Sequence, residues 1–176
     1  MSALDFYAQV TTRGDVLGAG LGATPDDWEA ALGAALGAEF LDVPGGGLLR
    51  RDYGLVEINF LPDQPELQGH MSCFGFGVKI QRLLYDRSPN TVPPPLARHY
   101  GPCAPRVAFK ELHVAVLALG HTIERDKSNT SRDMDRCRVS ESAARIHVIV
   151  DPDPYESGDP DPDGHQAGDI WSIDVW

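Results

Sequence analysis

The sequence is poor in cysteine and lacks the local motifs of a metal, nucleotide or disulfide site. Its three cysteines, Cys73, Cys103 and Cys137, are widely spaced, form no CxxC pair and have no zinc-type spacing to a histidine. Such scattered cysteines are typical of reduced thiols in a reducing compartment. The phosphate-binding pattern GxxxxGK[ST] is absent as well. We therefore expect no disulfide framework, no metal site and no bound cofactor.

Long apolar runs and an excess of basic residues are also missing. No stretch approaches the ~18 apolar residues of a membrane-spanning helix, and residues 1–10 lack the features of a signal peptide. The 15 basic and 26 acidic residues give a net charge of −11. This charge disfavours nucleic acid and anionic membranes as partners, because phosphates attract basic surfaces. We expect a soluble cytoplasmic protein, and a basic protein partner fits its charge.

The sequence contains enough apolar residues for one domain. It has 176 residues, of which 42% are hydrophobic, and a single domain usually has about 100–200 residues. Cap residues and apolar spacing predict a helix near 25–37, with Thr24 as N-cap and Pro25 at its first position. A second helix is predicted over 105–119. Its apolar second half predicts burial, and a buried strand remains the alternative there.

Alternating apolar residues predict most of the remaining elements as strands. Strands are expected at 6–11, 48–51, 55–60, 73–84, 121–125, 138–140, 145–150 and 169–176. In the third of these, Val56, Ile58 and Phe60 should face the core. In the fourth, Phe74, Phe76, Val78 and Ile80 should share one face, and Gly75 and Gly77 should leave room for a close approach on the other. The predicted fold is a single α+β domain over 1–176, with two helices packed on a mainly antiparallel sheet.

Two proline-rich segments interrupt these elements. Residues 88–105 hold five prolines besides Pro105, which predicts an irregular connector across the surface. Residues 151–168 hold six acids, four prolines and no lysine or arginine. Proline excludes a continuous helix or a central strand from this stretch. A long acidic loop inside a compact domain is usually functional or disordered.

Three weaker patterns point to chemistry without completing a motif. The stretch 159–164 (DPDPDG) matches the first half of a calcium loop, but Ile170 stands where the bidentate acid belongs, so we interpret it as a solvated acidic loop. The spacing of 18–22 (GAGLG) is not that of a dinucleotide fingerprint. Cys73 or Glu57 with a distant histidine could form a hydrolytic site, although Glu57 also suits a cross-strand ion pair beside Arg50. No catalytic residue is assigned.

Three segments of the sequence show a family resemblance as a set. They are 49–60 (LRRDYGLVEINF) after a helix, 109–112 (FKEL) leading to 119–120 (LG) and a strand, and 146–151 (IHVIVD) followed by 168–171 (GDIW). The arrangement resembles small actinobacterial immunity-type proteins, which neutralise the polymorphic toxins encoded beside them. The long acidic insertion departs from the shorter hairpin expected there.

The resemblance implies a protein that inhibits a toxin by occupying its active site or an adjacent surface. A basic toxin cleft could accept the acidic loop in place of phosphate. The expected partner-binding residues are the loop acids, one loop tyrosine and the last tryptophan: Asp153, Tyr155, Glu156, Asp159, Asp161, Asp163 and Trp176. A small hydrolytic enzyme and a scaffold domain with another protein partner remain the alternatives. Oligomeric state is left open.

Overall fold

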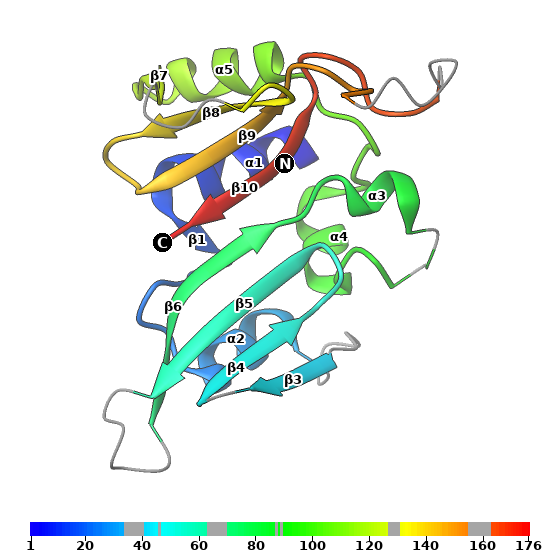
Figure 1. Cartoon of the computed structure of the whole chain (residues 1–176). Helices are drawn as coiled ribbons and strands as arrows, with labels where there is room; N and C mark the ends of the chain where they lie inside the picture. The colour runs from blue at the N-terminus through cyan, green and yellow to red at the C-terminus, as the bar shows by residue number, and fades with distance from the viewer. Residues whose placement is uncertain are drawn as a thin grey trace.

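The computed structural model describes residues 1–33, 41–45, 47–62, 70–86, 88, 90–126, 131–154 and 163–176. In this part of the chain, eight antiparallel strands form the central sheet (Figure 1). From one edge to the other they are β3 (Leu41–Gly45), β4 (Leu48–Asp52), β5 (Val56–Pro62), β6 (Met71–Val78), β10 (Ile170–Val175), β9 (Ala144–Ile149), β8 (Met134–Val139) and β7 (Ile123–Arg125). The α+β class and the mainly antiparallel sheet are therefore confirmed.

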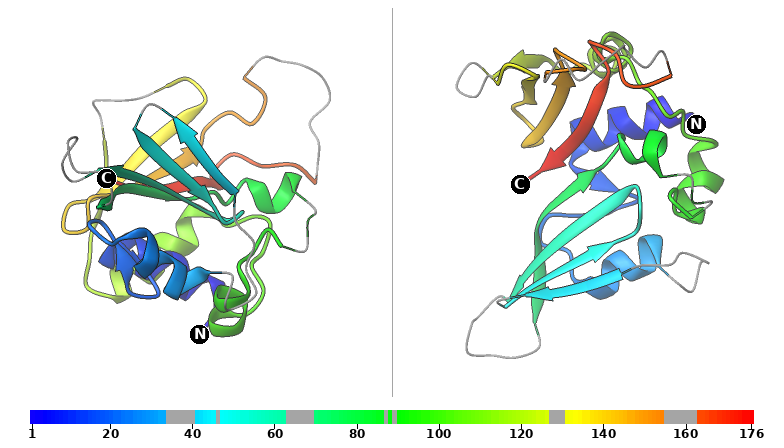
Figure 2. Two further views of the ribbon diagram at one scale, coloured as in Figure 1. Left: turned by 90° about the horizontal axis from the view of Figure 1, so that it is seen from below. Right: turned by 45° about the vertical axis from the view of Figure 1, so that its right-hand side comes forward.

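The helices lie on one face of the sheet and leave the other face open, as the left view of Figure 2 shows. The described helices are α1 (Ala3–Arg13), α2 (Pro25–Leu32), the one-turn α3 (Arg82–Tyr85), α4 (Pro94–Tyr100) and α5 (Phe109–Ala118). A short hairpin of β1 (Asp15–Val16) and β2 (Ala19–Gly20) connects α1 to α2. More helices are present than the two that the sequence predicted, but the layer arrangement is the same.

The hydrophobic core fills the space between the helices and the covered face of the sheet. The fully buried residues Val56, Ile58 and Phe60 confirm the predicted inward face of β5. Further core residues are Phe76 and Val78 of β6, Ile146 of β9, Ile173 and Val175 of β10, and Phe6, Tyr7, Val10, Trp28, Leu32, Leu112 and Val116 of the helices. Complete burial of one such side chain contributes about 1.5–3 kcal/mol. Stability is thus provided on one side of the sheet.

The beginning of α2 confirms the predicted cap. The Thr24 main-chain N–H donates to the Asp27 carboxylate at 2.8 Å, and the Asp27 N–H donates back to the Thr24 hydroxyl at 3.2 Å. This reciprocal pair satisfies two N–H groups that a helix otherwise leaves without partners. The helix ends at Leu32 with Gly33 as its C-cap, and residues 34–37 of the predicted helix lie outside the described residues.

The predicted strand at 6–11 is wrong, because these residues belong to α1. The Ser2 hydroxyl and the Asp5 carboxylate form a capping box at its beginning, and Gly14 ends it with a left-handed φ of 68°. Phe6, Tyr7 and Val10 are buried together, which is the spacing of one helix face. Six residues are too few to distinguish this helical period from the alternation of a strand.

The segment 88–105 was predicted to be irregular, yet it contains α4. Pro94 and Pro95 occupy the first turn of this helix, where no intrahelical N–H donor is needed. The predicted helix at 105–119 is a helix and not a strand, and it begins later, at Phe109. Its second half is buried on one face only. Leu112 and Val116 point inward, whereas Leu117, Leu119 and Val114, which is 68% exposed, lie on the surface.

Strand β6 is shorter than predicted and carries a bulge. The register pairs Gly75 with Asn59 but Cys73 with Phe60, so Phe74 has no direct partner on β5. A bulge reverses the alternation of the strand. Cys73 therefore lies on the core side, and Phe74 is exposed instead of sharing the face of Phe76. The residues after Val78 turn away from the sheet and form α3.

Candidate functional site

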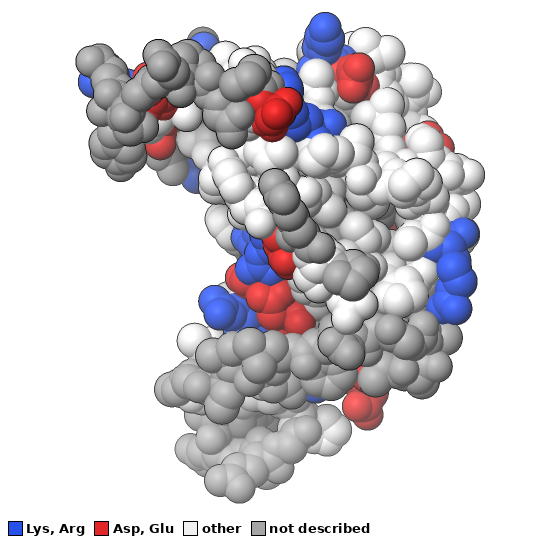
Figure 3. Space-filling view, turned by 90° about the vertical axis from the view of Figure 1, so that its right-hand side faces the viewer, with Lys and Arg blue, Asp and Glu red and all other residues white. Residues whose placement is uncertain are grey.

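The open face of the sheet is hollowed and carries charged side chains of both signs. Figure 3 shows the molecule in profile, with acidic and basic residues gathered in a concavity on one side. The right view of Figure 2 shows the bend that produces it, between β6 and β10. Only three residue pairs join these two strands, from Val78–Ile173 to Phe76–Val175. The sheet therefore behaves as two halves that meet at a short joint.

A row of residues in register crosses this open face. Opposite residues of paired strands lie on the same face, and the row runs from β7 to β4 through Glu124, Arg138, Arg145, Asp174, Gly77, Glu57 and Asp52. The neighbouring residues of the covered face are mostly apolar. The period-two pattern of the strands thus separates core side chains from a continuous polar strip.

Asp174 is at the centre of this strip. Its carboxylate lies 2.7 Å from the Lys79 ammonium, accepts a 2.8 Å hydrogen bond from the Ser172 hydroxyl and lies 3.4 Å from Nε2 of His147. The carboxylate is buried. A Cβ atom on Gly77 would overlap with it and with the Lys79 side chain. The predicted close approach over Gly77 is therefore confirmed. The missing side chain leaves space for the Lys79–Asp174 ion pair, which links β6 to β10.

Burial lowers the pKa of His147 below its ordinary value, which outweighs the opposing effect of the Asp174 carboxylate. The cationic side chains of Arg136, Lys79 and Arg145 lower this pKa further. His147 is therefore neutral at pH 7. A neutral imidazole beside Asp174 leaves Lys79 as the cation that balances this carboxylate.

Glu57 forms the predicted cross-strand ion pair, but with a second partner that the sequence did not reveal. Arg50 of β4 lies 4.0 Å from its carboxylate, whereas Arg82 of α3 lies 2.9 Å away and also contacts Asp52 at 2.6 Å. Arg51 points to the other side of the sheet and pairs with Glu29 of α2. Glu57 is therefore held by two arginines, which suits a structural ion pair better than a proton-transferring group.

Arg145 differs from the other cations of the open face. Lys79, Arg82, Arg136 and Arg138 each have a carboxylate partner within 3.3 Å. For Arg145 the described residues provide no ion pair, and its Nη1 has no hydrogen-bond partner among them. Its guanidinium instead lies over the indole of Trp176, with Cζ 4.9 Å from the ring centroid.

The expected partner-binding residues fall into two separate places. Asp153 and Asp163 flank the acidic loop where it leaves β9 and returns to β10, and Tyr155, Glu156, Asp159 and Asp161 lie outside the described residues. Trp176 follows the other end of β10 and is 52% exposed. It covers Gly75, where an added Cβ atom would lie 3.3 Å from the Cβ atom of Trp176. The length of β10 separates Trp176 from the loop and brings it to Arg145.

The returning end of the acidic loop packs on the molecule itself. His165 is only 7% exposed and lies between the rings of Tyr85 at 5.5 Å and Trp171 at 5.4 Å. Nearby, Arg106 holds the Asp169 carboxylate at 2.6 Å. The sequence did not reveal this anchor, because the acids and prolines of 151–168 predict one solvated stretch. The sequence feature that could have indicated this anchor is His165, which lies shortly before the apolar residues at the start of β10.

We expect the stability of the protein to decrease below about pH 6.5, the ordinary pKa of histidine, partly through His165. Burial lowers its pKa, against the raising effect of Asp169. The unfolded chain then binds a proton more readily than the folded one, so stability is present above pH 6.5 and is lost as the pH falls. In urea unfolding at pH 5, 6 and 7, the free energy of unfolding of the His165→Phe variant should decrease less with falling pH than that of the parent. Equal pH slopes would contradict this assignment.

The two groups considered for catalysis lie on opposite faces of the sheet. Cys73 is in the core, where its thiol donates to the Gly75 carbonyl at 3.5 Å. Burial raises the pKa of this thiol to about 11, so it is not a thiolate at neutral pH. Glu57 is on the open face, in register with Gly77.

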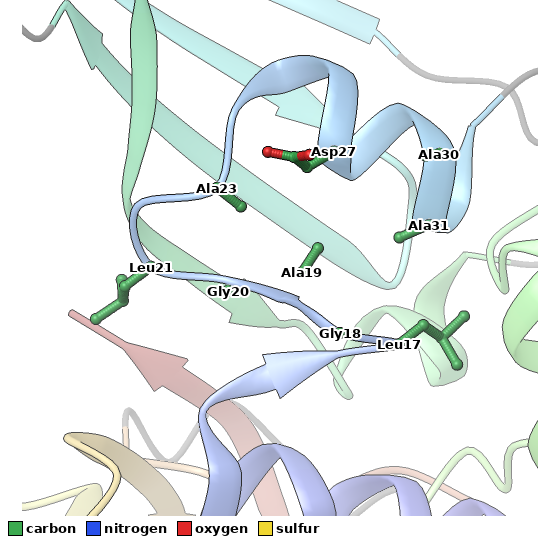
Figure 4. A pocket seen from close by; sticks show the side chains of 9 residues that line it. All are labelled: Leu17, Gly18, Ala19, Gly20, Leu21, Ala23, Asp27, Ala30 and Ala31. Atoms are coloured by element: carbon green, nitrogen blue, oxygen red, sulfur yellow. The ribbon is translucent and has the colours of Figure 1, made fainter.

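A surface pocket lies between the β1–β2 hairpin and α2 (Figure 4). Its volume is about 530 Å³, and it is lined by Leu17, Gly18, Ala19, Gly20, Leu21, Ala23, Asp27, Ala30 and Ala31. The ionisable side chain among these is Asp27, and its carboxylate is already engaged by Thr24 in the capping box. The described residues of this pocket therefore offer shape and small side chains but no free group for acid–base chemistry.

Within the described ranges, no group of three or more His, Cys, Asp or Glu residues is arranged to hold a metal ion. The helices of that same part are too short or too polar to cross a membrane. The chain was also compared with known proteins. No family model, no curated protein and no solved structure matches it.

Proposed function

We propose that this chain is a non-enzymatic protein-binding domain of the cytoplasm, and specifically an immunity-type inhibitor that covers the basic active site of a toxin. The observation that carries the proposal is the one-sided sheet. Its helices cover one face, while the other face is concave and polar.

The composition of the open face supports binding of a protein. This hollow face contains a half-exposed tryptophan and an arginine that has no counter-ion among the described residues. It thus provides an aromatic anchor and a charged donor for a partner. Tryptophan and arginine are the residues that most often dominate interface energies. A standard interface buries about 1,600 Å² in total, which a sheet of this width can supply.

The acidic loop supports a basic partner. Its six acids account for more than half of the net charge of −11, and the segment connects the end of β9 to the beginning of β10. A concentrated negative field accelerates encounter with a positively charged cleft. The open face would then set the lifetime of the complex, since dissociation is governed mainly by packed contacts.

The loop acids can be tested by charge removal. The triple variant Asp159→Asn/Asp161→Asn/Asp163→Asn should reduce the association rate with the toxin about tenfold or more at low salt and should flatten its salt dependence. Its melting temperature should stay unchanged. Stopped-flow or surface-plasmon measurements at several salt concentrations provide the rates.

A matched control removes the same number of charges elsewhere. The variant Asp26→Asn/Glu111→Gln/Glu141→Gln has the same net charge, and all three residues are exposed on other parts of the molecule. It should keep most of the parent's association rate. Equal losses in both variants would show that only net charge matters and would remove the loop from the binding site.

The inhibitor role itself is tested in cells. The proposal requires a toxin encoded beside this chain, and co-expression of the two should restore growth and yield a stable complex on gel filtration. A neighbouring protein that neither binds the chain nor is neutralised by it would refute the proposal.

A further inference from the structure

We infer that Arg145 and Trp176 form a recognition site for a carboxylate, in which an acidic side chain of a protein partner binds the Arg145 guanidinium from the hollow of the open face. The identity of that partner as a toxin rests on the proposed function, whereas the site itself follows from the geometry alone.

The charge of Arg145 is not balanced by the residues opposite it. Its position in the register is opposite Arg138 of β8 on one side and Asp174 of β10 on the other. Asp174 is already bound by Lys79 and Ser172, and Arg138 has Glu124 as its partner. Like charges directly opposite each other destabilise a sheet. Arg145 therefore destabilises the isolated fold, and its charge is available to an external anion.

The guanidinium of Arg145 lies against an aromatic ring. Its Cζ is over the Trp176 ring, 4.9 Å from the centroid, and the planar guanidinium fork matches the two oxygens of a carboxylate. Nη1 has no hydrogen-bond partner among the described residues, and the side chain as a whole is partly exposed. The exposed part of the guanidinium can therefore bind a carboxylate, and a charge-assisted hydrogen bond there would offset the missing internal partner.

The charge of the whole chain favours a carboxylate over a phosphate as the anion. The net charge of the chain is −11. The phosphates of a nucleic acid would be repelled by this negative charge, which opposes binding. A single carboxylate on an otherwise basic protein is not repelled in this way. Screening confines the field of each charge to ~8 Å at physiological salt, so the local excess of positive charge around Arg145 decides which side chain binds there.

The probe for the test is the peptide acetyl-Gly-Glu-Gly-amide, titrated into isotope-labelled protein at constant ionic strength. We expect saturable shifts of the Arg145 Nε–H and Trp176 indole N–H signals in NMR spectra. The neutral peptide acetyl-Gly-Gln-Gly-amide should produce none. Arg145→Gln, followed at the Trp176 signal, should weaken the binding about tenfold or more, because a charge-assisted hydrogen bond is lost. The control Arg138→Gln, at the neighbouring position in register, should leave the binding unchanged.

Stability gives a second readout that a purely structural arginine would not produce. Arg145→Gln should unfold at the same denaturant concentration as the parent or a higher one, since it removes a cation that faces Arg138. Two results overturn the inference: Trp176 shifts that are unchanged in Arg145→Gln, or inorganic phosphate binding where the glutamate peptide does not. If the peptide fails to bind while co-expression still neutralises the toxin, the carboxylate site is wrong and the proposed function stands.

Discussion

Asp174→Ala should lower the free energy of unfolding by about 3–5 kcal/mol, the range observed when one partner of a buried ion pair is removed. Asp174 is the acceptor for Lys79 at 2.7 Å and for Ser172 at 2.8 Å, and both groups would lose their partner on the open face. The pair also joins β6 to β10, where only three residue pairs connect the halves of the sheet. Urea unfolding at pH 7.5 measures this effect.

Two control variants distinguish the contribution of the Lys79–Asp174 ion pair from that of an ordinary surface ion pair. Glu124→Ala removes the carboxylate that pairs with Arg138, where both side chains are 56% exposed, and it should cost at most about 1 kcal/mol. Asp174→Asn keeps an oxygen for Ser172 but leaves Lys79 without a counter-charge, so its loss should be intermediate. A loss of less than about 1 kcal/mol in Asp174→Ala would mean that solvent already screens the pair.

Gly54→Ala should lower the free energy of unfolding by about 2–5 kcal/mol, because two costs add at this turn. Gly54 has φ +77°, a conformation that L-residues adopt at a cost. A Cβ atom there would lie 2.5 Å from the carbonyl oxygen of Thr91 and 2.9 Å from its Cα. That carbonyl accepts the Leu55 N–H at 2.6 Å, so it cannot move away without loss of the bond between the β4–β5 turn and residue 91.

Gly22 provides the matched control for this substitution. Its φ of +78° is nearly the same, but a Cβ atom there would meet nothing within 4 Å. Gly22→Ala should therefore cost only the backbone strain, about 1 kcal/mol. The difference between the two variants, measured by thermal and urea unfolding, isolates the contact with Thr91. Equal losses would show that the chain near Thr91 moves aside freely.

The elements that the sequence predicted well have their determinants close together. The N-cap and first turn from Thr24 to Asp27 span four residues, and the alternation of Val56, Ile58 and Phe60 spans five. Both are visible in a short window, and both are confirmed. The errors have local causes too. The prolines of the first turn of α4 indicated an irregular segment, because the sequence does not show that they stand at the beginning of a helix. The helix face formed by Phe6, Tyr7 and Val10 is short enough to resemble a strand.

The candidate site was predictable only in part, because it depends on pairings between distant segments. Glycine at position 77 indicated a close approach in the sequence, but the group that approaches is Asp174, which belongs to the last strand and is placed by the β6–β10 register. No residue near Arg145 in the sequence indicates that this arginine has no ion pair among the described residues. This state arises because Asp174 and Arg138 on the neighbouring strands are already occupied by Lys79 and Glu124.

The exposed side of α5 shows a different limit of pattern reasoning. The run from Val114 to Leu119 is apolar in every direction, which predicted complete burial. The fold places this helix at the side of the domain, with Leu112 and Val116 inward and Val114 and Leu117 on the surface. Composition indicated an apolar helix correctly, but the number of neighbours that cover such a helix is decided by topology.

The position of β10 has a consequence for how the protein is made. Residues 170–175 are inserted between β6 and β9, so a ribosome must synthesise all of the preceding strands before the sheet can close. Until then β6 and β9 present unpaired backbone, which other chains can recruit into intermolecular sheets. Contacts of such long sequence separation also form slowly. Production of this protein should therefore favour slow synthesis and low temperature, which give the last strand time to reach its place before neighbouring chains do.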